Sequence, residues 1–394
     1  MLKLRRAKVI DARPVDGPEQ QLVVALVDGA FEPAAAGADA QVSHSRRAAI
    51  ADVALVGASE VGDEVIVNVE ALDLGLGSGG FDIVHVNLSR GLDGQGLADA
   101  NVMKLNYTSL QHAVQPVEDE KLELPLSHPV GVLALHGQLA AVAWAFAQTA
   151  PERRLGYVQT SGGALPGGHS RVVGALRKRG LLAGHLTAGA AFGGEGEAIT
   201  TAGAVHHGLR TLGWDAVLCG PGPGIVGSRS PLGHGGMSAL DSAHAALALG
   251  APTLLVARMS SGDPRVRHRG ISHHTLTVLD LLLEPVTVAL PAGMRSPVGN
   301  DLRAGLGAVF GVSATSRPQL ELEVDRPARI ARHDWRRAIV DLPAYAASAL
   351  PAETMGRGLI EDPLFFGAAL AGGAALADML AQDEHRESRA DEAA

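Results

Sequence analysis

The sequence predicts an α/β fold: a small antiparallel β-domain followed by a doubly wound, mainly parallel α/β domain. Up to about residue 100, short apolar runs are separated by glycine-rich turns, and no helical periodicity of useful length appears. From Pro129 onward, short apolar runs alternate with helical patterns. The chain has 394 residues, more than one core usually supports, and 46% of them are hydrophobic. We therefore expect a β-rich domain over residues 1–110, an α/β domain over 111–381 and a disordered charged tail over 382–394.

In the first domain we expect strands at residues 21–27, 51–56, 64–69 and 81–88. The glycine-rich stretch 75–80 separates the last two apolar runs, which indicates a hairpin. A small barrel or sandwich follows from these short strands.

The second domain should alternate strands and helices. The expected strands are 130–135, 155–158, 182–187, 216–219, 253–257 and 286–290, and the expected helices are 138–149, 170–179, 197–212, 236–249 and 272–283. A further strand is expected at 319–324. Asp362 followed by Pro363 is a favoured helix start. The apolar stretch 364–380 contains Asp378 and is mostly Ala and Gly, so we interpret it as a buried helix and not as a membrane span.

Composition excludes several classes of protein. A net charge of −9 argues against nonspecific nucleic-acid binding, which needs a basic surface. Cys219 is the one cysteine, so an internal disulfide or a thiolate-rich structural zinc site is not expected, and we interpret this residue as part of the core. The first ten residues carry charge with no apolar run behind them, unlike a signal peptide. We expect a cytoplasmic protein that forms homo-oligomers and contacts no membrane.

Five strand-to-helix loops are rich in glycine and histidine, and the right-handed crossover rule predicts that they emerge at one edge of the sheet. Ligands of open α/β sheets bind at that carboxyl edge, and glycine lets backbone approach a ligand closely. Candidates for ligand binding in these loops are His136, Ser161, Gly162, Gly163, Gly167, Gly168, His169, Gly222, Gly224, Ser228, Arg229 and Arg265. The loops at 160–170, 220–236 and 260–274 should therefore be neighbours in space.

The same loops supply candidates for proton transfer. They are His234, His268, His273, His274, Glu195 and Asp263. Because adjacent residues point about 100° apart on a helix, we expect at most one of His273 and His274 to face the site. Arg265, Arg267 and Arg269 form either a solvated basic loop or an anion clamp. No residue is assigned as a metal ligand, and no cofactor is assigned.

Familiar catalytic motifs do not fit. Gly222, Gly224 and Gly227 match G-x-G-x-x-G, but they are interleaved with proline and the helix starts some nine residues late. No P-loop, G-x-S-x-G or H-E-x-x-H pattern occurs.

Four stretches have a more specific likeness: VGDEVIVNVEALDLGLGSGGFDIVHVNL, YVQTSGGALPGGHS, GPGPGIVGSRSPLGHGGM and RHRGISHHTLTVL. Together they resemble a bacterial family catalogued only as a domain of unknown function. The resemblance covers nearly the whole chain and implies one coherent protein. It implies no substrate, cofactor or catalytic residue.

Three functional hypotheses remain open. The first is a small-molecule enzyme or ligand-binding protein for an anionic, phosphorylated or nucleotide-like molecule. The second is a metal-dependent hydrolase that draws ligands from His136, His234, His268, His273 and Asp263. The third is a non-catalytic oligomeric protein whose loops sense a metabolite. Metal analysis separates the second from the first, and binding without turnover would favour the third.

Overall fold

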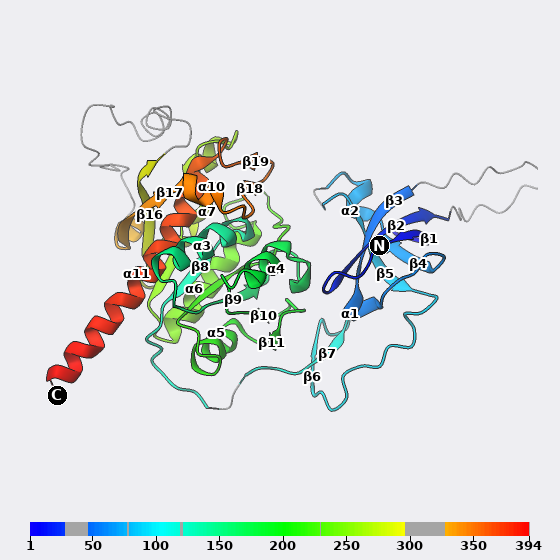
Figure 1. Cartoon of the computed structure of the whole chain (residues 1–394), viewed down its shortest axis with the longest axis horizontal. Coiled ribbons are helices and arrows are strands. Elements are labelled where there is room, and N and C mark those ends of the chain that lie inside the picture. Colours follow the sequence, from blue (N-terminus) through cyan, green and yellow to red (C-terminus); the bar gives the residue numbers. More distant parts are fainter. Residues whose placement is uncertain (28–45, 77–78, 119–120, 229, 296–327, 394) are drawn as a thin grey trace, which may run out of the picture. The chain divides into compact units, whose positions relative to one another are not determined.

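The computed structural model describes residues 1–27, 46–76, 79–118, 121–228, 230–295 and 328–393. The chain divides into two compact units, Met1–Val114 and Gln115–Ala394. The first is a small, mostly antiparallel β-barrel and the second contains a parallel sheet flanked by helices (Figure 1). The predicted fold class is confirmed.

The first unit is built around a closed five-stranded barrel in the order β1-β2-β3-β5-β4. Its elements are β1 (Leu4–Ala12), β2 (Glu19–Leu26), β3 (Arg46–Asp52), α1 (Val53–Val56), β4 (Glu64–Asn68), α2 (Glu70–Asp73) and β5 (Asp82–Asn87), followed by the pair β6 (Val102–Lys104) and β7 (His112–Val114). Alternating small apolar residues fill the barrel, among them Ala7, Val9, Val65 and Val67. The hairpin predicted around the glycine-rich stretch 75–80 is present, since β4 and β5 pair antiparallel.

Two local expectations for this unit were wrong. Strand β1 was not predicted, because its buried Ala7 and Val9 are small and alternate with charged residues. Residues 53–56 are helical and not part of a strand, because the Asp52 carboxylate caps the amides of Ala54 and Leu55.

The second unit contains an eight-stranded sheet in the order β11-β10-β9-β12-β8-β13-β16-β17, and all neighbouring pairs are parallel. The strands are β8 (Val130–Leu133), β9 (Leu155–Thr160), β10 (Gly184–Ala188), β11 (Gly196–Ala198), β12 (Ala216–Pro221), β13 (Thr253–Val256), β16 (Thr287–Arg295) and β17 (Asp334–Asp341). Two short hairpins join β14 (Met259–Ser260) with β15 (Gly270–Ile271) and β18 (Glu353–Thr354) with β19 (Arg357–Gly358).

Helices cover both faces of this sheet. One apolar core includes residues of α3 (Leu139–Thr149), α4 (Arg171–Lys178), α10 (Leu342–Ala347) and α11 (Pro363–Ala393). The other includes residues of α5 (Thr201–Arg210), α6 (Ser238–Ala248), α7 (His273–Leu281) and α9 (Ala328–Ala331). Residues 363–382 of α11 are apolar and long enough to cross a membrane, but 83% of the apolar window is buried inside the protein. This segment is therefore a core helix, as the sequence predicts.

The strand order places a topological switch at the centre of the sheet. The chain leaves β8 through α3 on one face, whereas it leaves β12 and β13, the two neighbours of β8, through α6 and α7 on the other face. Loops that diverge to opposite faces open a crevice at the carboxyl ends of such strands, where ligands of doubly wound folds bind.

The end of the chain differs from expectation. Helix α11 continues to Ala393, whereas disorder was expected from residue 382 (Figure 1). The charged tail is rich in Ala, Glu and Arg, which are strong helix formers and extend the helix. Strand β17 was not predicted, and the strand expected at 319–324 lies outside the described residues.

Candidate functional site

The three predicted loops are neighbours at the carboxyl edge. The amide of Ala164 donates to the carbonyl of Pro223 at 2.5 Å, which joins loop 160–170 to loop 220–236. The ring of His234 stacks on that of His274 with centroids 3.3 Å apart, which joins loop 220–236 to loop 260–274. The predicted convergence of these loops is confirmed.

Glycine in these loops has a packing explanation. A Cβ on Gly235 would lie 1.7 Å from the carbonyl oxygen of Gly162, and one on Gly163 would lie 2.2 Å from that of Gly222. A side chain at either position would drive the loops apart. The close backbone approach is therefore between loops, and ligand contact by these glycines stays a prediction.

Four histidines lie close together in the loops after β12 and β13, the two strands that flank β8. The centroids of His273 and His274 are 4.2 Å apart, and His268 lies 4.9 Å from His273 and 4.8 Å from His274. His234, His268 and His274 are buried, and His273 is the half-buried member. We call His234, His268, His273 and His274 the histidine cluster.

Both adjacent histidines, 273 and 274, belong to the cluster, whereas we expected at most one of them to face the site. Ser272 caps α7, and its Oγ accepts a hydrogen bond from the His274 amide and lies 2.8 Å from His268 Nδ1. This cap sets His273 and His274 in the first turn of the helix. There the two imidazoles meet at an interplanar angle of 62°.

Burial keeps the cluster neutral at pH 7. Desolvation, reinforced by positive neighbours, lowers the pKa of His234 to about 4, that of His268 to about 3 and that of His274 to about 2. The pKa of His273 is lowered too, by burial and then by the guanidinium of Arg267. Neutral imidazoles each present one N–H donor and one nitrogen lone pair.

A buried arginine connects the cluster to a charge network. Arg258 is 3% exposed, and its Nη1 lies 2.7 Å from His274 Nδ1. Since a guanidinium only donates, His274 Nδ1 is the acceptor and the ring proton of this neutral imidazole sits on Nε2. Burial lowers the pKa of Arg258 to about 10, so the group stays charged at pH 7.

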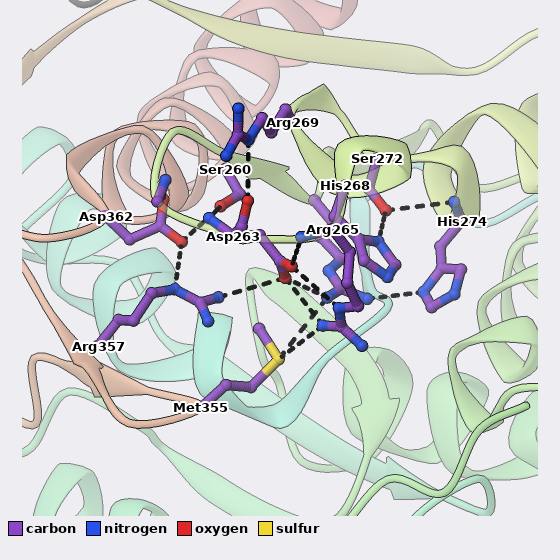
Figure 2. Close-up of polar contacts among 12 residues, drawn as sticks. Ser260, Asp263, Arg265, His268, Arg269, Ser272, His274, Met355, Arg357 and Asp362 are labelled. Atoms are coloured by element: carbon purple, nitrogen blue, oxygen red, sulfur yellow. Dashed lines mark hydrogen bonds and ion pairs between the residues drawn. The ribbon is translucent and has the colours of Figure 1, made fainter. Parts of the chain in front are cut away.

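Asp263 is the centre of that network and is fully buried. Figure 2 shows it bonded to Arg265 through both carboxylate oxygens, at 2.9 and 2.8 Å, and to Arg357 at 3.4 Å. Arg357 also donates to Asp362, whose carboxylate holds the hydroxyl of Ser260. Desolvation opposes the charge of Asp263, but the guanidinium of Arg265 outweighs it and lowers the pKa of the carboxyl. Asp263 is therefore a positioning carboxylate committed to arginines.

Several polar atoms of the histidine cluster and of Arg258 have no hydrogen-bond partner among the described residues. They are Nδ1 and Nε2 of His234, Nε2 of His273 and Nε of Arg258. Buried nitrogens are rarely left unsatisfied, because the lost hydrogen bonds to water cost about 1–3 kcal/mol each. Such atoms indicate a place where a ligand, an ion or water completes the structure.

A metal ion is one group that could occupy this space. One nitrogen each from His268, His273 and His274 lie within 4.8 Å of one another. Three imidazoles resemble the ligand set of catalytic zinc sites. The Nδ1 of His274, however, is taken up by Arg258, and this guanidinium adds positive charge where a dication would sit.

Other predicted residues lie apart from the cluster. Glu195 pairs with Arg177 at 2.5 Å and accepts from the His185 amide, so it holds the β10 loop. His136 contacts Ser170 and Pro221. Ser228 closes a turn within its own loop by accepting from the Ser230 amide.

The remaining predicted residues have these positions. Ser161 is exposed, and its carbonyl oxygen accepts a hydrogen bond from the Thr160 hydroxyl. Gly167 and Gly168 start the turn that contains His169. Gly224 has a positive φ and no atom near its Cβ position, and Arg229 lies outside the described residues.

Sequence reasoning missed Arg258, Asp362 and Arg357. Arg258 lies two residues after the end of β13. An arginine at the carboxyl end of a buried strand is the sequence signal that could have identified it. Asp362 and Arg357 come from a segment about 100 residues further along, and no local pattern links them to Asp263.

A hollow of about 1050 Å³ lies at the opposite edge of the sheet. It is lined by Thr253, Thr287 and Asp334, at the starts of β13, β16 and β17, and by Arg332 and Asp378. Its lining contains no histidine, so the chemistry described above does not lie there.

Comparison with known proteins identifies the family. No curated protein and no solved structure matches the chain. A family model described as "Protein of unknown function (DUF3866)" matches residues 48–373, which include the histidine cluster, most of β3 and all of β4 and β5, but not β1 and β2. The chain therefore belongs to the DUF3866 family.

Proposed function

We propose that the protein binds a small anionic molecule at the histidine cluster and transfers protons to or from it. The carrying observation is the set of unpartnered nitrogens on His234, His273 and Arg258 around the neutral cluster. The location agrees, since the loops of β12 and β13 meet at the topological switch beside β8.

Charge supports an anion as the ligand. Asp263, the carboxylate that Arg258 links to the cluster, is committed to Arg265 and Arg357. Arg258 and Arg267 both depress histidine pKa values, which means that the site has a positive potential. A phosphate or carboxylate group would relieve this potential and accept hydrogen bonds from imidazole and guanidinium N–H groups.

His273 is the residue best suited to proton transfer. It is the most exposed of the four histidines, its Nε2 is unpartnered and its ring is neutral, so it can accept a proton from a bound substrate. Its neighbours have other tasks: His268 is held by Ser272 and His274 by Arg258.

Calorimetric titration with inorganic phosphate, pyrophosphate and a nucleoside triphosphate tests this proposal. We expect one of these anions to bind and to raise the melting temperature, because a ligand that binds only the folded state stabilises it. Replacing His273 by Ala should weaken binding about 10- to 100-fold, which corresponds to about 1.5–3 kcal/mol for a hydrogen bond to a charged group. His128→Ala, at the amino end of β8, is the control and should bind as wild type. Equal affinities in the wild type and the His273 variant would refute the site.

A metal-dependent hydrolase is the second candidate, and the 4.8 Å grouping of nitrogens from His268, His273 and His274 favours it. It requires Arg258 to leave His274. Metal analysis of the purified protein, followed by Co²⁺ titration, separates the two. A tetrahedral cobalt spectrum that His268→Ala abolishes would establish the metal site, and an anion affinity unchanged by chelator would argue against it.

A further inference from the structure

Ser170 and His136 form a hydrogen-bonded pair and are not members of the histidine cluster. His136 Nε2 lies 2.7 Å from Ser170 Oγ, and His136 Nδ1 lies 3.1 Å from the carbonyl oxygen of Pro221. Because a carbonyl only accepts, the ring proton of His136 is on Nδ1 and the lone pair of Nε2 faces the serine hydroxyl. Ser170 Oγ also accepts from the Val173 amide at 3.1 Å, which leaves its O–H free to donate to His136.

The pair lies where the fold places ligands. His136 follows β8, Ser170 ends the loop after β9, and Pro221 is the last residue of β12. These three strands are adjacent in the sheet, and their loops diverge to opposite faces. Ser170 is also the N-cap of α4, whose first-turn amides form the positive end of an eight-residue helix.

A second, independent observation indicates a ligand at this place. His185, on β10, is 4% exposed, and its Nε2 has no hydrogen-bond partner among the described residues. Its ring stacks on Tyr157 at 5.4 Å and lies against Gly167, where a Cβ would be 2.8 Å from His185 Cε1. The Tyr157 hydroxyl in turn donates to the carbonyl of Pro221 at 3.0 Å, and His136 Nδ1 contacts the same oxygen, so Tyr157 links His185 to the Ser170–His136 pair.

Helix capping alone does not explain this arrangement. A cap needs only the acceptor lone pair of Ser170, whereas here its proton is directed at a buried, neutral imidazole that a third group orients. Nucleophile, base and orienting acceptor are the parts of a serine-based acyl-transfer site, with a backbone carbonyl in the third position.

We infer that Ser170 is a nucleophile toward carboxylic esters and that His136 is its general base. Ser170 Oγ attacks the ester carbonyl carbon while its proton moves to His136 Nε2. The bond to the alcohol oxygen then breaks, and His136 returns the proton to the leaving alcohol. Water, activated by the same imidazole, hydrolyses the acyl-serine and regenerates the hydroxyl. First-turn amides of α4, such as that of Val172, are placed to stabilise the oxyanion.

Covalent labelling of the full-length protein tests this inference. The reagents are phenylmethylsulfonyl fluoride and a small fluorophosphonate, because Ser170 is only 5% exposed. Mass spectrometry of the digested protein should find the adduct on Ser170. Ser170→Asn, which keeps a capping side chain, should give no adduct, and His136→Gln should slow labelling at least about 100-fold. Circular dichroism should show both variants folded.

Two comparisons keep the outcomes distinct. Ser127 lies 3.4 Å from His128 on the surface and is a second Ser–His pair, so Ser127→Ala should leave labelling unchanged. A chelator should leave labelling unchanged too, because this inference does not rest on the proposed anion site or on a metal ion. An absent Ser170 adduct, or one formed equally fast in folded His136→Gln, would overturn it.

Discussion

At the scale of single residues, the buried histidines make stability depend on pH. In an unfolded chain a histidine titrates near pH 6.5, whereas burial lowers the pKa of His234 to about 4 and that of His268 to about 3. Below pH 6.5 the unfolded state therefore binds protons that the folded state does not, and the free energy of unfolding falls as pH falls. Each such residue contributes up to about 1.4 kcal/mol per pH unit between the two pKa values.

Urea unfolding at pH 7.0, 6.0 and 5.0 measures this effect. The three tryptophans, Trp144, Trp214 and Trp335, all belong to the second unit, so their fluorescence reports its unfolding alone. We expect full stability above pH 6.5 and a decline below it. In the double variant His268→Gln, His274→Gln, the free energy of unfolding should fall less steeply with falling pH, because unfolding then takes up about two fewer protons. A wild-type curve that is flat from pH 7 to pH 5 would show that these histidines are protonated in the folded state.

At the scale of loops and strands, the sequence predicted what depends on local pattern. Alternating apolar and helical runs revealed β8, β9, β10, β12, β13 and β16, the six strands between the edge strands β11 and β17, which were missed. Asp362 with Pro363 marked the start of α11. The glycine- and histidine-rich loops were found because they are local as well. The ion network was not, because Asp263 and Arg357 are about 100 residues apart and meet only through packing.

The sequence also could not predict which side chain each candidate site residue contacts. Composition alone could not tell that Glu195 pairs with Arg177, or that His136 faces Ser170 and not the other histidines. These pairings depend on which loops diverge to which face of the sheet. In strand β1, charged residues alternate with small apolar ones, and this pattern identifies a strand only once the closed barrel is known.

The contact between the loops yields an element-scale prediction. A Cβ on Gly235 would lie 1.7 Å from the Gly162 carbonyl oxygen, so Gly235→Ala must separate loops 160–170 and 220–236. We expect anion affinity to fall more than tenfold while the circular dichroism spectrum is retained, because these loops lie outside the two cores. Gly174→Ala, a helix position with nothing within 4 Å of the new Cβ, is the control. Wild-type affinity in Gly235→Ala would mean that the loop contact does not position the site.

At the scale of the whole molecule, each unit contains its own apolar core. The barrel core lies within residues 7–84, and the two cores of the sheet lie within residues 126–380. The histidine cluster and Arg258 belong entirely to the second unit. Homo-oligomerisation stays a prediction.

This division predicts that residues 115–394 fold alone and bind the anion as tightly as the full chain, within about twofold. Calorimetric titration of the purified fragment measures it. A folded fragment that does not bind the anion would show that the barrel contributes to the binding site.

The most direct test of the central claim is a crystal structure of the full-length protein grown with tungstate, a heavy tetrahedral oxyanion. We expect an anomalous tungsten peak beside the histidine cluster, with an oxygen within hydrogen-bond distance of His273 Nε2 and of the Arg258 guanidinium. A peak that avoids the cluster, or a transition-metal peak bound by His268, His273 and His274 in its place, would contradict it.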